Sequence, residues 1–313
     1  MFKNIIELMQ SSIPPFYTLN SGYKCPVMGL GTSDMTNVTE VVYASIKHGA
    51  RLIDTAARYE NEKEIGLALT KAINENIVKR EDLFIITKLS TYEKAEPEKA
   101  IKGSMERLNV SYIDLFLDHW PSSPKFKNGV SYPAEPMHVY WPKMEELVKK
   151  GYAKSIGVCN YNIQSMCNLL SLCTIKPAVL EIEYHPYLYQ KVLRDFCRKE
   201  NIRIIAYNSL CKGPYVQEFF KEENLNLLTE KVIKEMSKKY NKTPGQIALN
   251  WSISQGVIAI PRTSSTERMK ENLLSTSFKM NDEDIEKIGK LNKNFHFCSS
   301  LNWKSFNDID VFA

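Results

Sequence analysis

The regular alternation of short apolar runs with longer amphipathic segments is the feature that most restricts how this chain can fold. The apolar runs are bounded by polar turns, as buried strands are, and occupy residues 27–31, 51–54, 83–87, 113–118, 153–158, 178–182, 203–207 and 257–260. Segments with helical periodicity fill the intervals, at residues 38–48, 61–76, 96–108, 140–150, 162–171, 189–199, 228–255 and 266–275. Eight strands that each precede a helix predict an α/β protein with a (β/α)8 TIM barrel, and an open doubly wound sheet is the alternative.

The segments outside this repeat also have predicted places. Residues 10–26 are polar and contain Leu19-Asn-Ser-Gly22, which favours a β-hairpin that plugs the bottom of the barrel. No linker composition interrupts the chain, so we expect a leader of uncertain order at 1–14 and one barrel domain at 15–313. Three stretches are too long for turns, and in a barrel the first two leave the face that holds active sites. They are 121–136, 211–226 and the tail after Leu291.

Composition excludes several classes of function. The net charge of +5 arises from 41 basic and 36 acidic residues spread along the chain, which is typical of a solvated surface and not of a nucleic-acid interface. No apolar run approaches the roughly 18 residues of a membrane span. The seven cysteines include no CxxC pair, so we expect neither a disulfide framework nor a metal site. A cytoplasmic protein that is a monomer or weak dimer fits these features best.

Four chemically active residues stand at, or just after, the ends of three consecutive predicted strands. Asp54 ends the second strand, Tyr59 follows in the same loop, Lys88 ends the third strand and His119 follows the fourth. Each has an ordinary explanation alone, as a helix cap, a snorkelling lysine or a satisfied core histidine. In a parallel barrel, however, the carboxyl ends of all strands lie on one face. The four side chains are therefore predicted to meet in one site.

Together these residues suit proton donation to a carbonyl oxygen. Tyr59 is the candidate acid, and an ammonium at Lys88 favours its phenolate and is expected to pull its pKa toward neutrality. Asp54 would hold Lys88 charged and in place, and a neutral His119 would orient the carbonyl. A hydride must come from a cofactor, because no side chain supplies one. A Schiff-base enzyme or lyase that uses Lys88 is an alternative.

The region after the last strand favours phosphate binding. The segment from Ile258 to Asn272 runs from that strand into a short helix, where barrels commonly bind phosphate. Arg268 falls in the first helical turn, a position that a cation avoids unless an anion lies there. A dinucleotide-binding sheet would instead carry G-x-G-x-x-G, but Gly29-Leu-Gly31 lacks the third glycine. This disfavours the doubly wound sheet.

Seven motifs carry a family resemblance. They are Gly29-Leu-Gly-Thr32, Leu52-Ile-Asp-Thr-Ala-Ala-Arg-Tyr59-Glu-Asn-Glu, Ile86-Thr-Lys88, Asp114-Leu-Phe-Leu-Asp-His119-Trp-Pro, Gly157-Val-Cys-Asn160-Tyr-Asn, Glu183-Tyr-His-Pro-Tyr187 and Ile260-Pro-Arg262. In this order they resemble the aldo-keto reductase superfamily, of the aldose reductase and xylose reductase type, from about residue 16 to the end. The resemblance implies a (β/α)8 barrel. It also implies that Asp54, Tyr59, Lys88 and His119 form the catalytic tetrad.

The resemblance further implies NADPH as the cofactor. Its 2′-phosphate would be bound by Arg262, Thr263 and Arg268, and its adenine by Asn272. Tyr207 would stack under the nicotinamide. The other implied cofactor contacts are Gly31, Thr32, Ser33, Asp54, Asn160, Glu181, Asn208 and Leu210.

Three positions depart from the usual pattern of that family. Cys159 replaces a serine, Glu181 replaces a glutamine, and Tyr207-Asn-Ser-Leu-Cys211 replaces Tyr-Ser-Pro-Leu-Gly. An ionised Glu181 accepts hydrogen bonds but donates none, whereas glutamine does both. We therefore expect altered cofactor contacts and not their loss.

On the substrate side, the resemblance assigns His119, Trp120 and Cys298, and Cys298 resembles a reactive tail cysteine. Ser33 or Asp34 stands where many relatives have an aromatic residue, so the mouth of the pocket is expected to be open and polar. The predicted function is NADPH-dependent reduction of an aldehyde or ketone to an alcohol, with Tyr59 as general acid. The alternative is a nucleotide-binding sensor or regulatory subunit without significant turnover.

Overall fold

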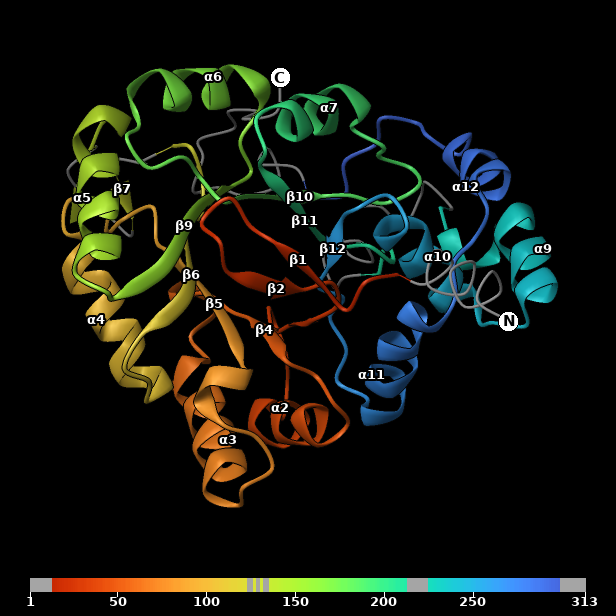
Figure 1. The fold of residues 1–313 in the computed structure, drawn as a ribbon, viewed down its shortest axis with the longest axis horizontal. Helices are drawn as coiled ribbons and strands as arrows, with labels where there is room; N and C mark the ends of the chain where they lie inside the picture. The colour runs from red at the N-terminus through yellow and green to blue at the C-terminus, as the bar shows by residue number, and fades with distance from the viewer. Residues whose placement is uncertain (1–12, 123–125, 128–129, 132–134, 213–224, 299–313) are drawn as a thin grey trace, which may run out of the picture.

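Eight parallel strands form the central sheet, at the places that the sequence predicted. The computed structural model describes residues 13–122, 126–127, 130–131, 135–212 and 225–298. Every neighbouring pair in the sheet is parallel, and the strands follow one another in chain order (Figure 1). They are β3 (Leu30–Gly31), β4 (Leu52–Asp54), β5 (Phe84–Leu89), β6 (Ile113–Asp118), β9 (Ala153–Cys159), β10 (Val179–Glu183), β11 (Arg203–Tyr207) and β12 (Ile258–Ala259).

The first and last strands meet and close the ring. An isolated parallel bridge joins Gly31 to Arg262, and the amide of Gly29 donates to the carbonyl of Ala259 at 2.9 Å. A Cβ atom at Gly31 would lie 2.7 Å from the backbone oxygen of Ile260, so glycine permits this approach. The sheet is therefore a closed barrel, and the doubly wound alternative is wrong.

Helices surround the barrel and cover the outer faces of its strands (Figure 1). The predicted helical segment 228–255 forms two helices. Each of the other predicted helical segments forms a single helix. No helix in the described ranges is both long and apolar enough to cross a membrane. The helices are α2 (Val38–Lys47), α3 (Glu62–Asn74), α4 (Pro97–Leu108), α5 (Met137–Lys149), α6 (Ile163–Leu172), α7 (Lys191–Lys199), α9 (Lys231–Tyr240), α10 (Pro244–Ile253), α11 (Thr266–Leu273) and α12 (Asp282–Gly289).

Helix α12 was not predicted, although its sequence carries a start signal. The side chain of Asn281 accepts a hydrogen bond from the amide of Asp284 at 2.8 Å. Acidic residues fill the first turn, where they complement the helix dipole. The helix was missed because it is short and follows an already complete set of eight strand and helix pairs.

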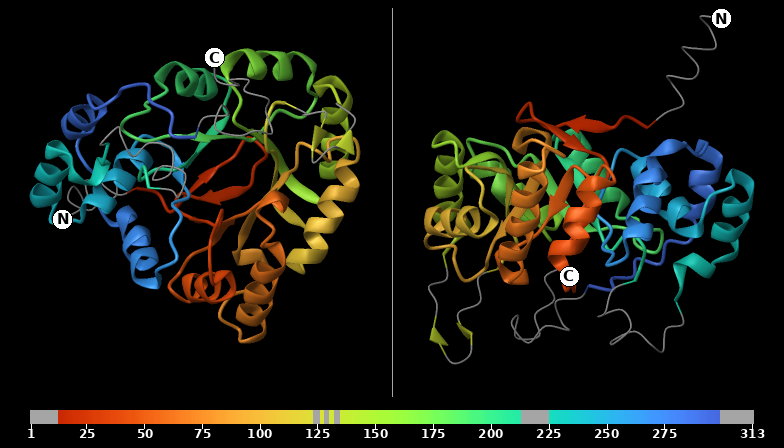
Figure 2. Two further views of the ribbon diagram at one scale, coloured as in Figure 1. Left: turned by 180° about the vertical axis from the view of Figure 1, so that it is seen from behind. Right: turned by 90° about the horizontal axis from the view of Figure 1, so that it is seen from below.

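The predicted hairpin lies across the amino-terminal end of the barrel (Figure 2). Leu19 and Cys25 are buried in the same apolar cluster as the interior side chains of the strands. The side chain of Asn20 donates to the backbone oxygen of Pro177 at 2.9 Å, which ties the turn to the barrel rim. The hairpin plug is thus confirmed. Its strands are β1 (Phe16–Thr18) and β2 (Lys24–Pro26).

The predicted loops and leader lie partly outside the described residues. The residues that lie outside the description are 1–12 of the leader, 213–224 of the loop 211–226 and 299–313 of the tail. Within the loop 121–136, two short antiparallel strands are described, at the end of the barrel opposite the β1–β2 hairpin (Figure 2). They are β7 (Phe126–Lys127) and β8 (Val130–Ser131).

Two apolar layers hold the barrel together. Side chains that alternate along the strands fill its interior, among them Leu52, Ile86 and Val179. The opposite faces of the strands pack with the helices in a larger cluster that includes Trp141 and Trp251, both fully buried. Because the interior is filled with side chains, an open site can form only at its end.

Candidate active site

The alternation of side chains along each strand places the polar residues of the site. In four strands, and directly after the end of a fifth, the polar residue lies two positions beyond an apolar residue of the barrel interior, so both point to the same side. The polar residues thus form a layer directly above the apolar filling, at the carboxyl ends of the strands. The pairs are Leu52 and Asp54, Ile86 and Lys88, Leu117 and His119, Val179 and Glu181, and Ile205 and Tyr207.

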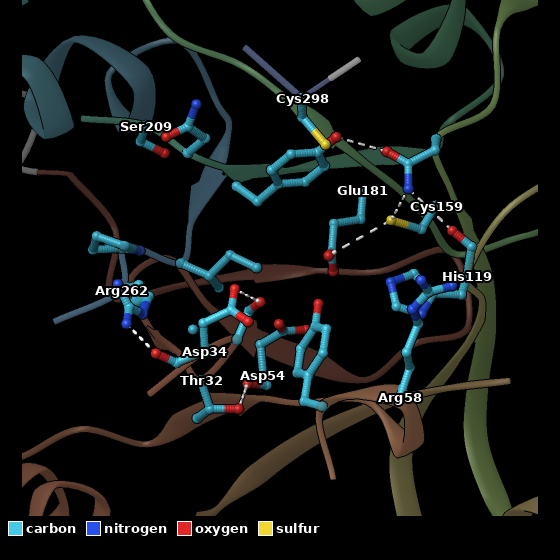
Figure 3. A pocket seen from close by; sticks show the side chains of 18 of the residues that line it. Thr32, Asp34, Asp54, Arg58, His119, Cys159, Glu181, Ser209, Arg262 and Cys298 are labelled. Carbon is cyan, nitrogen blue, oxygen red and sulfur yellow. Dashed lines mark hydrogen bonds between the residues drawn. The ribbon is translucent and has the colours of Figure 1, made fainter. Parts of the chain in front are cut away.

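This layer forms the floor of a cavity of about 660 Å³. Arg262 and His119 lie at opposite ends of the view in Figure 3, with Asp54 and Glu181 between them. Most residues predicted for the site line this cavity, whereas Lys88, Thr263, Arg268 and Asn272 do not. The predicted residues that line it are Gly31, Thr32, Ser33, Asp54, Tyr59, His119, Trp120, Asn160, Glu181, Tyr207, Asn208, Leu210, Arg262 and Cys298.

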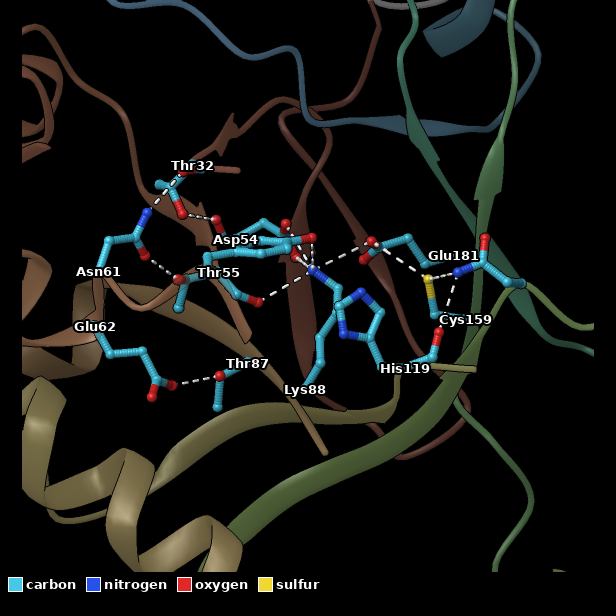
Figure 4. Close-up of polar contacts among 12 residues, drawn as sticks. Thr32, Asp54, Thr55, Asn61, Glu62, Thr87, Lys88, His119, Cys159 and Glu181 are labelled. Atoms are coloured by element: carbon cyan, nitrogen blue, oxygen red, sulfur yellow. Dashed lines mark hydrogen bonds and ion pairs between the residues drawn. The ribbon is translucent and has the colours of Figure 1, made fainter. Parts of the chain in front are cut away.

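Lys88 lies beneath the cavity and holds the acidic and phenolic groups together (Figure 4). Its Nζ donates to both carboxylate oxygens of Asp54, at 2.8 and 2.7 Å, and to the backbone oxygen of Thr55 at 3.1 Å. The hydroxyl of Tyr59 lies 3.4 Å from the same Nζ. The predicted group of carboxylate, lysine and tyrosine is therefore assembled.

The loop that carries Tyr59 is fixed by Asn61 and by Glu62, the first residue of α3. Asn61 donates to the backbone oxygen of Thr32 at 2.8 Å and accepts from the hydroxyl of Thr55 at 2.9 Å. The next residue, Glu62, accepts from the hydroxyl of Thr87 at 2.6 Å. These bonds tie the loop to three strands, so the tyrosine stands in a rigid setting.

Electrostatics make Lys88 a permanent cation. Burial alone would lower the pKa of this amine, but the carboxyl groups of Asp54 and Glu181 outweigh it and raise the pKa well above its usual value. A Schiff-base mechanism needs a neutral amine nucleophile. The alternative of a lyase that uses Lys88 is therefore disfavoured by the structure.

The pKa of Tyr59 differs from the expected direction. Burial raises it, and although Lys88 lowers it as predicted, Asp54 and Glu181 raise it further. The net pKa lies above the ordinary value of 10.0 and is not pulled toward neutrality. The sequence analysis counted the lysine but could not count the burial. Tyr59 is thus a phenol at neutral pH, as a proton donor must be.

His119 is buried and neutral. Burial, followed by the charges of Lys88, Arg58 and Lys94, holds the pKa of its imidazole well below the usual value. Its ring meets the ring of Tyr59 edge to face, with 5.7 Å between the centroids. The predicted neutral histidine is therefore placed beside the phenol.

Behind His119 lies a buried ion pair. The Nζ of Lys94 donates to Asp118 at 2.9 Å and to the backbone oxygen of Trp120 at 2.6 Å. The hydroxyl of Tyr140 also donates to Asp118, at 2.7 Å. Asp118 and Trp120 are the two sequence neighbours of His119, so this network fixes the backbone that presents the imidazole.

Asn160 and Tyr207 form a hydrogen-bonded pair in the wall of the cavity. Asn160 adopts a left-handed backbone conformation, with φ of 64°, which asparagine tolerates better than most residues. Its amide nitrogen donates to the backbone oxygen of His119 at 3.0 Å, and its oxygen accepts from the hydroxyl of Tyr207 at 2.7 Å. Both residues are therefore held where the resemblance places the nicotinamide.

The phosphate end of the predicted cofactor site is split between the cavity and its border. Arg262 lines the cavity and donates to the backbone oxygen of Asp34, and its buried Nε has no hydrogen-bond partner within the described ranges. Arg268 is exposed in the first turn of α11, beyond the amino-terminal cap that Ser265 provides. An unpaired guanidinium nitrogen, a second arginine and a helix amino terminus form a donor set suited to phosphate. The residues fit the predicted cofactor.

Cys298 lines the cavity, but it does not have the character of a reactive thiol. It is buried, and its backbone amide donates to Oε2 of Glu183 at 3.0 Å. Burial and the Glu183 carboxylate raise the pKa of its thiol far above the ordinary value. Its burial beside Glu183 therefore gives no support to the role of a reactive cysteine, which stays a prediction from the resemblance.

Comparisons with known proteins agree with this geometry. A model of the Aldo/keto reductase family matches residues 21–293. The chain is 36% identical to an NADH-dependent D-xylose reductase of Candida parapsilosis, over 96% of this chain and 98% of the relative. It is 37% identical to an NAD(P)H-dependent D-xylose reductase of Candida tenuis, over 97% of this chain and 100% of the relative.

A solved structure of a Bombyx mori aldo-keto reductase in complex with NADP has a TM-score of 0.86 and 30% identity, and the match covers 93% of this chain and 96% of that one. The chain belongs to the aldo/keto reductase family. Its eight strands form the (β/α)8 barrel of that family.

This aldo/keto reductase also lines its cavity with residues that sequence reasoning missed. Arg58 and Glu60 flank Tyr59, while Ser209 and Lys212 follow the end of β11. The available signal was adjacency, since direct neighbours of a predicted residue in a tight turn often face the same space. Arg58 has a clear electrostatic effect, because its charge lowers the pKa of a neighbouring imidazole. The last two such residues are Ile260 and Pro261.

Proposed function

We propose that this aldo/keto reductase reduces an aldehyde or ketone to an alcohol with hydride from NADPH, and that Tyr59 is the proton donor. The family is one of NAD(P)H-dependent carbonyl oxidoreductases, which leaves the roles of individual residues as the proposal. One observation carries it: the Tyr59 hydroxyl lines the cavity and lies 3.4 Å from the ammonium of Lys88. The relatives are reductases, so a sensor without turnover has no support.

The side chains supply the proton and stabilise the charge that its transfer creates. As the Tyr59 proton moves to the carbonyl oxygen, the phenolate left behind is stabilised by the adjacent Lys88 ammonium, which Asp54 holds in place. Neutral His119 donates a hydrogen bond to the same carbonyl oxygen and orients it. NADPH, when bound, would supply the hydride to the carbonyl carbon. Tyr59 then regains a proton from solvent.

The arginines favour NADPH over NADH. The 2′-phosphate of NADPH adds about two negative charges, and a planar guanidinium binds phosphate through two parallel hydrogen bonds. Arg262 and Arg268 flank the start of α11, and we assign the phosphate to them and to Thr263, with Asn272 on the adenine. The adjacent Gly31, Thr32 and Tyr207 complete the cofactor wall.

An open-chain sugar aldehyde is the first substrate to test. The lining of the cavity includes polar and charged residues, among them Asp34, Arg58 and Lys212, which suit the hydroxyl groups of a polyol chain. Trp120 provides an apolar wall beside the histidine. The D-xylose reductases among the relatives support the same choice.

The proposal is tested by steady-state reduction of a panel that contains D-xylose, an aliphatic aldehyde, an aromatic aldehyde and a ketone, with NADPH and NADH in parallel. Tyr59→Phe removes only the hydroxyl and should lower kcat about 10² to 10⁴-fold, the contribution of a general acid. Tyr23→Phe, which alters an exposed tyrosine of the barrel bottom, is the matched control. Equal turnover in Tyr59→Phe and the parent would overturn the assignment of the acid.

The cellular setting completes the proposal. All seven cysteines are free in the structure, which fits a reducing compartment such as the cytosol. We infer a cytoplasmic enzyme that acts on a small carbonyl compound as a monomer or weak dimer.

A further inference from the structure

Lys88 has a second carboxyl partner besides Asp54. The Oε1 atom of Glu181 lies 3.3 Å from the Lys88 Nζ (Figure 4). All three side chains are almost completely buried, with exposed fractions of 1% for Lys88, 3% for Asp54 and 2% for Glu181. One buried cation therefore contacts two buried carboxyl groups, which also interact with each other.

This cluster is stable only if one carboxyl group keeps a proton. Two carboxylates and one ammonium would leave a net negative charge in a region with little water, which is strongly unfavourable. Asp54 makes two contacts to the ammonium, at 2.7 and 2.8 Å, whereas Glu181 makes one longer contact. Within the described ranges, Oε2 of Glu181 has no hydrogen-bond partner. The proton therefore belongs on Glu181.

We propose that Glu181 works in this active site as a neutral carboxylic acid beside the Lys88–Asp54 pair, and that loss of its proton suppresses proton donation by Tyr59. This inference rests on the function proposed above. Glu181 acts on the tyrosine through the lysine, so it is a positioning residue. Burial and the nearby Asp54 carboxylate raise the pKa of Glu181 to about 8, close to working pH.

Glu181 is the member of this cluster whose pKa lies near 8, as its neighbours show. From β9, Cys159 lies opposite in register, and its thiol contacts Oε1 at 3.7 Å. From β11, the residue opposite is Ile205, which does not titrate. Lys88, Tyr59 and Cys159 all have pKa values above their ordinary values of 10.5, 10.0 and 9.0. Burial also raises the pKa of Asp54 above its ordinary value of 3.8, although the Lys88 ammonium opposes this shift.

Ionisation of Glu181 makes Tyr59 a weaker proton donor. The charge of Glu181 raises the pKa of Tyr59, because a second anion next to Lys88 cancels part of the field that stabilises the phenolate. Reduction should therefore be fastest while Glu181 is protonated and should decline as the pH rises through its pKa. The matched substitution is Glu181→Gln, since glutamine has the shape of the neutral acid and cannot ionise.

The kinetic test is the pH dependence of kcat/KM in the parent and in Glu181→Gln, each normalised to its own value near pH 7. We expect the parent to lose about tenfold or more by about pH 10, with a midpoint near 8, and the glutamine variant to lose less than about threefold. Glu181→Asp, which still ionises, should keep a decline in this range. An equally steep decline in the parent and in Glu181→Gln would overturn the proposal.

A second measurement needs neither cofactor nor turnover. In protein labelled with ¹³C at the glutamate side-chain carboxyl, the infrared band of a protonated carboxylic acid should be present near pH 6 and lost near pH 10. The band should be absent from Glu181→Gln. Glu183, the other buried glutamate of the site, stays ionised because hydrogen bonds from His185, His296 and Asn208 outweigh its burial and lower its pKa to about 2.

The two measurements separate this inference from the proposed function. If no carbonyl compound is reduced but the band titrates, the function fails and the protonated glutamate stands. If reduction occurs and the labelled parent shows no protonated acid near pH 6, the inference fails alone.

Discussion

Replacement of Glu181 by glutamine should change how protein stability depends on pH. A glutamate with a pKa of about 8 in the folded state and 4.5 in the unfolded state is protonated in both below about pH 4. Between these values the folded state holds a proton that the unfolded state has released, so its stability falls by about 1.4 kcal/mol per pH unit. Above the folded pKa the loss reaches its full size, up to about 5 kcal/mol. Glutamine has no such loss.

The assay is chemical denaturation in urea at intervals from pH 5 to pH 10, with the free energy of unfolding obtained by linear extrapolation. Every other titrating group is common to the parent and Glu181→Gln, so the difference between their curves isolates the glutamate. Near pH 5 the difference should be small. By pH 9 the variant should be the more stable protein by several kcal/mol.

A constant difference between the two curves across this range would refute the reasoning. It would mean that Glu181 releases the same number of protons when folded and unfolded, and hence that the cluster around Lys88 tolerates two carboxylates. Circular dichroism of both folded proteins near pH 7 provides the control, because identical spectra exclude a change of fold.

Two further substitutions test other parts of the site. Arg262→Ala should raise the KM for NADPH at least about tenfold and leave the KM for NADH nearly unchanged. The control is Lys270→Ala, which removes an exposed cation of α11 and should change neither KM. Equal effects on both cofactors in Arg262→Ala would contradict the phosphate assignment. Lys94→Met should destabilise the fold by about 3 to 5 kcal/mol, because Asp118 would remain as an uncompensated buried charge. The same variant should raise the pKa of His119, measured by NMR titration, because the charge of Lys94 lowers that pKa. An unchanged histidine pKa would show that this ion pair has no electrostatic role.

Much of the site was predictable because it follows from the period of a strand. Asp54, Lys88 and Glu181 lie two residues beyond interior apolar residues, so their direction is set by the same alternation that identifies the strands. Tyr59 and His119 follow in loops that a closed barrel brings to one face. The positions of these side chains depend on the topology of the barrel and could therefore be predicted from the sequence.

The ionisation states of the site residues could not be predicted from the sequence, because they depend on burial and on neighbours from distant segments. The sequence analysis treated Glu181 as ionised, and no local signal shows that Lys88, 93 positions earlier, lies 3.3 Å away. The same limit applies to Cys298, because only the structure shows that it is buried beside Glu183. Tyr59 shows it again, since burial outweighs the lysine that the motif suggested.

The β1–β2 hairpin has a consequence for the timing of proton exchange. It seals the amino-terminal end of the barrel with Leu19 and Cys25, and apolar side chains fill the interior between this seal and the polar layer. In the described part of the chain, water therefore reaches Glu181 from the cavity side. A cofactor bound in that cavity would stand between Glu181 and the solvent. We therefore expect proton exchange at this glutamate to be slower in the filled site than in the empty one.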